Sequence, residues 1–249
     1  MEWEEPGIVA DVRPYGEGDA IASVMTETHG VHRGLARGGA AKARAATWQP
    51  GNILQLRWIG RVPEQLGVFT GELVHPTAAL VLDAPLPLAL LSSACAVADG
   101  ALPEREPHPP VFGGLLRLLA GLGGAAPPVA DYIRWEATLL AGLGYGLDLA
   151  ACAVTGATSG LCYVSPKTGR AVSDAGAGSW RERLLPLPPF LLGATGGTPA
   201  EWLQGLRLTG HFLARDAFGH YHRPLPASRL MLEDRVAALA GAKPEEPIA

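Results

Sequence analysis

The first 75 residues consist of short apolar segments separated by turn-forming residues, and this pattern restricts the fold more than any other feature. Alternation of apolar and polar residues between Gly- and Pro-containing turns is typical of half-buried strands. The pattern predicts strands at residues 7–14, 20–27, 30–38, 52–62 and 66–75, with one longer loop at residues 39–50. Five short strands fit a small closed barrel of the OB-fold type, and an SH3-like barrel would give much the same pattern.

Beyond the last of these strands, Leu- and Ala-rich segments with helical spacing follow, so an α+β chain with more than one domain is expected. One helix is predicted between Pro128 and Gly144. Four apolar residues share one face of that helix: Tyr132, Trp135, Leu139 and Leu143. A second helix is predicted to begin at a capping box formed by Thr198 and Glu201, and a last helix covers residues 226–241.

Residues 147–176 do not show helical periodicity. The runs LCYV and RAVS flank the turn SPKTG, which predicts a β-hairpin. Two cysteines, Cys152 and Cys162, fall in this region. Structural zinc is almost always held by four convergent ligands, commonly with CxxC pairs, and neither cysteine belongs to such a pair. Two buried thiols in a hairpin are therefore the favoured interpretation.

Composition excludes several classes of protein. A chain of 249 residues with 48% hydrophobic and 18% charged residues is typical of one large globular domain or two small ones. The start, MEWEEPG, lacks the basic and then apolar run of a secretory signal. The most apolar region, residues 78–98, is interrupted by Asp83, Pro85 and Pro87 and would be a poor membrane span. With only three cysteines, no disulfide framework is expected, and we predict a soluble cytoplasmic protein.

One basic stretch stands out in an acidic chain. Residues 28–63 contain no Asp or Glu, whereas the whole chain has a formal net charge of -4. The stretch carries six basic residues: Arg33, Arg37, Lys42, Arg44, Arg57 and Arg61. An acid-free basic face attracts phosphates and speeds their association, so polyanion binding is a hypothesis for this stretch. Exposed strands and loops are also often charged without any such role.

Two further features have alternative interpretations. Trp48 could stack on a base, but a Trp before a Pro-Gly turn more often anchors the loop in the core, and we favour the core. Near the C-terminus, His211, His220 and His222 accompany several arginines, opposed by one acid, Asp216. These arginines form either a second basic surface or a solvated helix end: Arg207, Arg215, Arg223 and Arg229.

Common enzyme motifs do not occur in the sequence. It contains no GxSxG, GxxxxGK or HExxH pattern. SPKTGR lacks the glycine spacing of a phosphate loop, and GLGYG is better explained as a helix C-cap than as a dinucleotide fingerprint. No catalytic residue is therefore predicted.

Longer motifs resemble a known family. They are T-x-x-H-G at residues 26–30 and E-x-x-L-L-x-x-L-G-x-x-L-D-L-x-x-C-x-x-T-G at residues 136–156. Together with WQPGNILQLRWIGR, these motifs resemble the RecO family of bacterial DNA repair proteins, in the form found in alphaproteobacteria. The similarity covers the chain to about Ser173 and is weaker beyond it.

The resemblance implies an N-terminal OB-fold at residues 1–76 that binds DNA, and a helical domain at residues 77–249. A degenerate zinc-finger-like insertion is implied at about residues 147–176. It also implies a non-enzymatic recombination mediator of the RecF pathway, associated with the bacterial nucleoid. Such proteins bind single- and double-stranded DNA, anneal complementary strands, and work with RecR and the tail of single-strand-binding protein to load RecA. An RNA-binding or protein-docking module is the alternative, ahead of an enzyme acting on nucleotides.

This sequence departs from the family at the zinc positions. Zinc-bearing members have two CxxC pairs in the insertion, whereas Cys152 is followed here by Thr155 at the second position. Ser173 and Gly176 stand about where the other pair would be. We therefore predict no metal and no cofactor. The six basic residues of the acid-free stretch are the predicted DNA face of the barrel.

Overall fold

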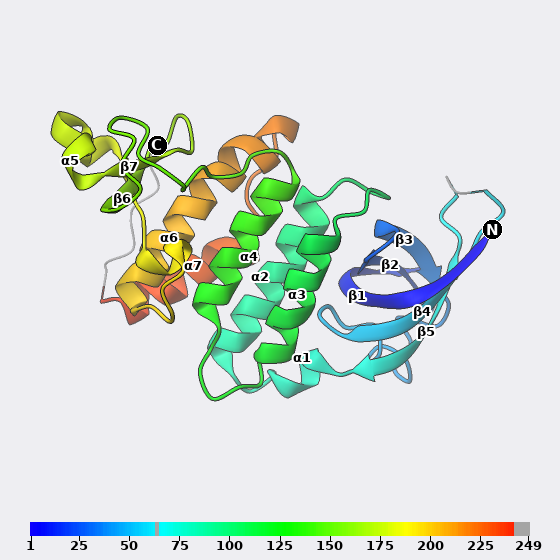
Figure 1. Cartoon of the computed structure of the whole chain (residues 1–249). Coiled ribbons are helices and arrows are strands. Elements are labelled where there is room, and N and C mark those ends of the chain that lie inside the picture. The colour runs from blue at the N-terminus through cyan, green and yellow to red at the C-terminus, as the bar shows by residue number, and fades with distance from the viewer. Residues whose placement is uncertain (63–64, 242–249) are drawn as a thin grey trace. The chain divides into compact units, whose positions relative to one another are not determined.

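The computed structural model describes residues 1–62 and 65–241 (Figure 1). The chain forms two compact units, residues 1–128 and residues 129–249. The first unit contains a five-stranded sheet followed by helices, and the second is mainly helical. The expectation of an α+β chain with N-terminal strands followed by helices is confirmed.

The strands of the first unit close into a barrel in the order β1-β2-β3-β5-β4. Their bounds are β1 (Glu2–Tyr15), β2 (Asp19–Thr26), β3 (Gly30–Ala36), β4 (Ile53–Ile59) and β5 (Val68–His75). All pairings are antiparallel except the one between β3 and β5. The strands overlap the predicted segments, but β1 begins earlier than expected, because its first residues pair with β4 from Glu2 opposite Ile59.

Alternation along the strands builds the barrel core. In β4, Leu54, Leu56 and Trp58 are buried, while Arg57 and Ile59 between and after them are exposed. The buried cluster consists of Val9, Ala22, Val24, Ala36, Trp48, Leu54, Leu56, Trp58 and Phe69. Gly34 allows the Phe69 ring to pack directly on β3, since a Cβ at this position would lie 2.5 Å from the ring.

Three helices complete the first unit: α1 (Thr77–Leu80), α2 (Pro85–Ala101) and α3 (Pro109–Gly121). Helix α2 contacts β1 and β2. Near its C-terminal end, Asp99 accepts a hydrogen bond from Ser23 of β2, and the Cys95 thiol donates to the Val9 carbonyl at 3.7 Å. The compact unit therefore extends to residue 128, beyond the expected domain end at 76. Whether residues 1–76 form an independent domain stays a prediction.

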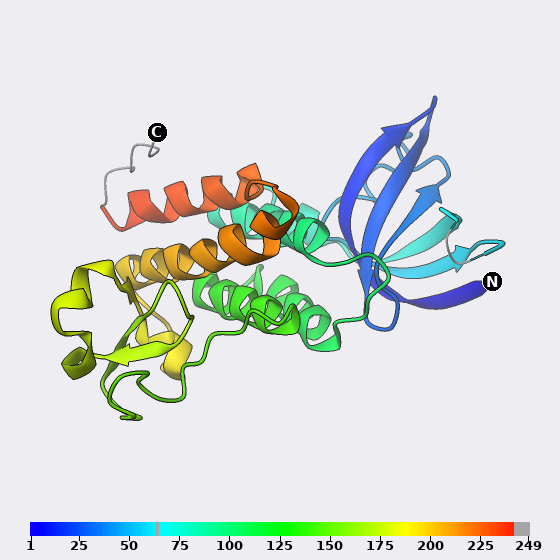
Figure 2. The ribbon, with the colours of Figure 1, turned by 90° about the horizontal axis from the view of Figure 1, so that it is seen from above.

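The second unit is built on α4 (Val129–Gly142), α6 (Pro199–Phe212) and α7 (Ala227–Leu239). Helix α6 contacts both of the others, and Figure 2 shows α6 and α7 side by side. The predicted capping box is present, because Thr198 accepts from the Glu201 N–H at 3.3 Å and Glu201 accepts from the Thr198 N–H at 2.7 Å. Helix α6 continues as a π-helical turn, η3 (Leu213–Phe218), and a 3-10 turn, η4 (Gly219–Tyr221).

A small sheet with the order β7-β6-β8 lies between α4 and α6 in the sequence. Strands β6 (Leu161–Val164) and β7 (Ala171–Ser173) form the predicted hairpin, and β8 (Leu185–Pro186) pairs with β6. Three short helices accompany the sheet: α5 (Asp174–Ala177), η1 (Gly178–Arg183) and η2 (Pro189–Leu192). Within the described ranges, no helix combines the length and apolar character needed to cross a bilayer.

Candidate nucleic-acid interface

A groove of about 540 Å³ on the barrel is lined by β1, β4, β5 and the loop between β3 and β4. This loop, residues 37–52 and here called the basic loop, carries Arg37, Lys42 and Arg44. The charged residues that line the groove are Glu4, Arg37, Arg44, Arg57 and Glu72. The groove therefore brings together three of the six predicted DNA-binding residues, and Lys42 lies on the same loop.

The basic loop presents its charges to solvent. The Arg37, Lys42 and Arg44 residues are all exposed, and none has an ion pair within the described part of the chain. Strand β3 ends at Ala36, so Arg37 is a loop residue and not the strand residue that the sequence suggested. Arg44 donates to the Arg37 carbonyl oxygen at 3.2 Å, which holds these two residues near each other.

The base of the basic loop is fixed at both ends. The Gly38 N–H donates to the Asp19 carboxylate at 2.7 Å. At the other end, the buried Asn52 amide donates to the carbonyl oxygens of Ala46 at 2.8 Å and Thr47 at 3.1 Å. Because the loop is already ordered, binding a ligand there costs less conformational entropy than ordering a free loop would.

Trp48 anchors the basic loop in the barrel core. Its side chain is 4% exposed and belongs to the buried cluster, with its ring centroid 6.3 Å from that of Phe69. The favoured interpretation of Trp48 as a core residue is confirmed. Asn52 was missed by sequence reasoning, although a polar residue at the start of an apolar strand was a usable signal.

Two of the predicted residues are neutralised by acids from other parts of the fold. Arg33 pairs with Asp99 at 3.3 Å and Glu104 at 2.9 Å. Arg57 pairs with Glu2 at 2.6 Å, and its hydrogen bond lowers the pKa of the Glu2 carboxyl below its ordinary value. The stretch is thus free of acids in the sequence but not in space, and the free positive charge is concentrated on the basic loop. Arg61 is exposed just after β4.

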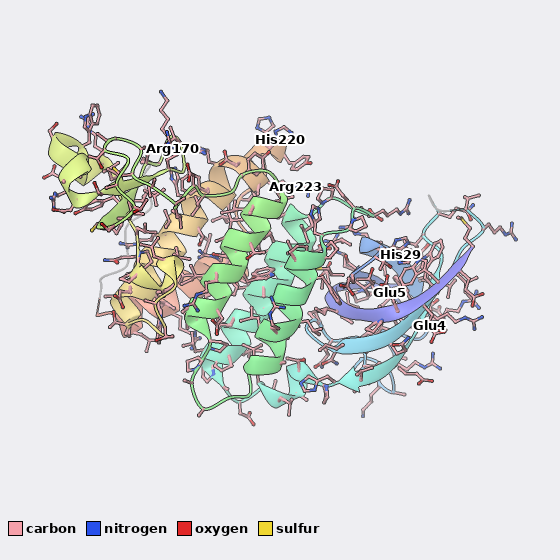
Figure 3. The ribbon with its side chains drawn as sticks, in the orientation of Figure 1. Glu4, Glu5, His29, Arg170, His220 and Arg223 are labelled. Atoms are coloured by element: carbon pink, nitrogen blue, oxygen red, sulfur yellow. The ribbon has the colours of Figure 1, made fainter. Side chains whose placement is uncertain are left out.

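The T-x-x-H-G motif forms a tight turn between β2 and β3. Thr26 accepts from the His29 N–H at 3.2 Å and donates to the Gly30 carbonyl at 3.3 Å. Gly30 has φ +63 and lies against the backbone of Glu106, where a Cβ would meet the carbonyl oxygen at 2.2 Å. His29 also pairs with Glu5, and Figure 3 shows Glu4, Glu5 and His29 together on the barrel. The motif therefore has a structural role at this turn.

His32 lies next to this turn inside an aromatic cluster. Its ring centroid is 4.9 Å from that of Trp58 and 5.5 Å from that of Trp3. The residue is 4% exposed, and neither ring nitrogen has a hydrogen-bond partner among the described residues. Burial, with a smaller effect from Arg105, lowers the pKa of His32 to about 4, so the ring is neutral near pH 7.

The second predicted basic group does not form one surface. Arg229 has no exposed side-chain area and pairs with Glu136 at 2.6 Å, so including it in a surface was wrong. Arg207 lies near Glu233 at 3.7 Å, and Arg215 pairs with Asp216 at 2.7 Å. Arg223 is exposed with its guanidinium 5.8 Å from the centre of the Tyr221 ring, and Figure 3 labels it together with His220.

Cys152 lies at the centre of a hydrogen-bonded group in the hairpin region. Ser173 donates to its sulfur through the backbone N–H at 3.2 Å and through the hydroxyl at 3.3 Å. The Thr155 N–H donates at 3.4 Å, and these hydrogen bonds lower the pKa of the Cys152 thiol to about 6. A Cβ on Gly176 would lie 2.9 Å from the sulfur. The four positions that the resemblance predicts as counterparts of a zinc site, residues 152, 155, 173 and 176, thus converge, but only Cys152 carries a thiol.

These residues do not fit zinc, which needs four suitable ligands. Across residues 1–62 and 65–241, no group of three or more His, Cys, Asp or Glu residues could hold a metal ion. Cys162 is exposed and donates to the Gly160 carbonyl at 3.3 Å, so its predicted burial was wrong. The absence of metal from the protein itself stays a prediction.

Known protein families match parts of both units. The family model described as Recombination protein O N terminal matches residues 1–77, and the model described as Recombination protein O C terminal matches residues 84–225. A protein named DNA repair protein RecO from Gluconacetobacter diazotrophicus is 57% identical over 249 residues, covering 96% of each chain. Proteins with the same name from Granulibacter bethesdensis and Acidiphilium cryptum are 57% and 54% identical.

The two matches and these identities place the chain among recombination and repair proteins. It belongs to the RecO family. The resemblance found in the motifs is confirmed.

Proposed function

We propose that this protein acts in bacterial DNA repair as a non-enzymatic recombination mediator that binds single- and double-stranded DNA and anneals complementary strands. Family membership supports the repair role, since the relatives are named DNA repair protein RecO. The observation that carries DNA binding is the basic loop, where three exposed cations without ion pairs in the described structure stand on a fixed base.

The barrel is proposed to be of the OB-fold type. Its five strands in the order β1-β2-β3-β5-β4 and its parallel β3–β5 pairing support this assignment over other small barrels. Barrels of this type bind single strands in a basic groove that follows the phosphate backbone. The groove beside the basic loop, with Arg37 and Arg44 in its wall, is the proposed counterpart here.

Annealing follows from the same charges. Two complementary strands repel each other through their phosphates, and a protein that binds both strands reduces this repulsion and raises their local concentration. No bond is made or broken in this role, which agrees with the lack of the common catalytic motifs in the sequence. The acids Glu2, Asp99 and Glu104 neutralise Arg57 and Arg33, so DNA contact is expected mainly at the basic loop and Arg61.

The proposed partners are RecR, the tail of single-strand-binding protein and, through them, RecA. Family membership is the support for these partners. A direct test uses the purified full-length protein and single-strand-binding protein with its tail either intact or removed. The proposal expects binding only to the form with the tail.

The function is tested by annealing of complementary oligonucleotides by the full-length protein and by a loop variant carrying Arg37→Ala, Lys42→Ala and Arg44→Ala. A control variant removes three other exposed arginines: Arg13, Arg117 and Arg235. Both variants lower the net charge equally, so a general charge effect would slow both. Loss of annealing in the loop variant alone supports the proposal. A strong preference for RNA would favour the RNA-binding alternative.

A further inference from the structure

A second groove, of about 520 Å³, lies beside the β6–β7 hairpin in the second unit. It is bounded by the hairpin turn at residues 165–168, by β7, and by the helical segment that follows β7. Most of its wall is apolar, including Val154, Val172, Trp180 and Leu184. Here it is called the hairpin groove.

The hairpin groove has a large aromatic side chain exposed at its wall. Trp180 is 61% exposed and Val154 is 68% exposed. A Trp is usually largely buried, and an exposed one beside an apolar groove marks a surface that a partner covers. The indole is therefore available as a flat platform for stacking.

The charge of the hairpin groove selects an anionic partner. Lys167 and Arg183 line it and are exposed, and none of its lining residues is acidic. The Arg183 guanidinium lies 5.3 Å from the centre of the Trp180 ring, which joins a cation to the aromatic platform. Three acids lie nearby: Asp174 pairs with Arg181 at 2.8 Å and Asp148 with Arg170 at 3.2 Å, while the exposed Glu182 next to Arg183 does not line the groove. Arg170 is labelled in Figure 3.

We propose that the hairpin groove is a second binding site for single-stranded nucleic acid, in which a base stacks on Trp180 and adjacent phosphates approach Lys167 and Arg183. A ligand must offer both flat apolar groups and negative charge, and a single strand offers both at every nucleotide. A duplex is a poorer ligand, because its bases already stack on one another. The inference rests on the proposed function for the nucleic-acid ligand, but it concerns a different site from the basic loop.

A second site would serve annealing by holding one strand while the basic loop holds another. It would also explain why the indole of Trp180 is exposed beside an apolar groove. An acidic peptide with apolar side chains is the competing occupant, and the experiment separates the two. A peptide does not depend on unpaired bases, so it would leave the affinity for single strands unchanged when Trp180 is removed.

The experiment measures the affinity of the full-length protein and its Trp180→Ala variant for a fluorescent thymidine oligonucleotide, for an abasic strand of equal length, and for a duplex. Stacking on one base contributes about 1–3 kcal/mol, so the variant should bind the thymidine strand about 5- to 150-fold more weakly. Its affinity for the abasic strand and for the duplex should change less than about twofold. Lys167→Ala with Arg183→Ala should weaken binding of both single strands.

Tyr221→Ala is the matched control, because Tyr221 is 55% exposed and also has an arginine over its ring but does not line the hairpin groove. An equal loss in this control, or an unchanged affinity of Trp180→Ala for the thymidine strand, would overturn the inference. If the basic-loop variant loses binding while the Trp180 variant does not, the proposed function stands and the second site falls. If the unmodified protein binds no single strand, both fall.

Discussion

The Arg229 guanidinium donates from Nε to the Glu136 carboxylate at 2.6 Å, and neither side chain has any exposed area. Arg229 lies on α7 and Glu136 on α4, and both reach α6. Thr209 of α6 donates to Glu136 at 2.5 Å, and Arg229 donates to the Leu206 carbonyl at 2.6 Å. The Tyr132 hydroxyl also donates to Glu136 at 2.6 Å. One buried ion pair and its hydrogen bonds therefore connect α4, α6 and α7.

Removing one partner of this pair should be costly. Arg229→Met leaves the Glu136 carboxylate buried without its counter-charge, and we expect the free energy of unfolding to fall by about 3–5 kcal/mol. Adding Glu136→Leu should recover part of that loss, because the unpaired charge is then removed as well. Chemical denaturation of the full-length protein measures both effects.

The control for this prediction is the exposed pair between Arg13 and Asp11, in which the Arg13 side chain is 77% exposed. Arg13→Ala should change the free energy of unfolding by at most about 1 kcal/mol. A loss of less than about 1 kcal/mol in Arg229→Met would contradict the account of the buried pair.

His32 should make the barrel less stable in acid. Its pKa is lowered from 6.5 to about 4 in the folded protein, so between these values the unfolded chain binds more protons. The pH dependence due to His32 therefore lowers the free energy of unfolding as the pH falls from about 6.5 toward 4. This loss is at most about 3 kcal/mol. The measurement is the free energy of unfolding at several pH values for the native protein and for His32→Leu.

The free energy of unfolding of the native protein minus that of His32→Leu should increase as the pH rises from 4 to 7. Other groups titrate in both proteins and cancel in this comparison. Parallel pH profiles for the two proteins would show that His32 is not held neutral by burial.

Zinc content tests the hydrogen-bonded group around Cys152. The purified protein should hold less than about one tenth of an equivalent of zinc, because tetrahedral coordination needs four ligands. The variant with Thr155→Cys, Ser173→Cys and Gly176→Cys should bind about one equivalent, since these positions already converge on Cys152. Elemental analysis measures both, and stoichiometric zinc in the native protein that disappears in Cys152→Ala would refute the prediction.

Truncation tests how the barrel is bounded. Residues 1–76 should fold alone as a β-barrel, since this segment contains all five strands and the buried cluster. Residues 1–128 should be more stable, because they add helix α2 with Asp99, the partner of Ser23 and Arg33, and with Cys95, which contacts Val9. Circular dichroism and denaturation measure both fragments. A disordered 1–76 fragment beside a folded 1–128 fragment would place the domain boundary after α3.

The sequence predicted the elements of this fold because their signals are local. The strand alternation around Trp58, the capping box at Thr198 and the hairpin around residues 165–169 depend on neighbours within a few positions. The charges were harder to predict, because pairing depends on contacts between distant segments. Arg33 meets acids 66 and 71 residues away, and Arg229 meets Glu136 across 93 residues.

Part of the candidate site could have been predicted more closely. Pairing β1 with β4 in an antiparallel register places Glu4 opposite Arg57 and brings Glu2 near it, and the Glu residues of β1 were visible in the sequence. The burial of Arg229 carried no such signal, because its segment has both polar and apolar neighbours. The three cations of the basic loop have no ion pair among the described residues, although Glu4 and Glu72 line the same groove.

The most direct test of DNA binding at the basic loop is the salt dependence of affinity for single-stranded DNA. Each phosphate contact contributes about -0.7 to the slope of log affinity against log salt on single strands. Four contacts, from the three loop cations and Arg61, predict a slope of roughly -3. The variant Arg37→Ala, Lys42→Ala, Arg44→Ala should flatten it by about 2 and weaken binding to all sequences alike, while the control triple variant keeps the native slope. An unchanged slope in the loop variant would contradict the account and place the DNA site elsewhere.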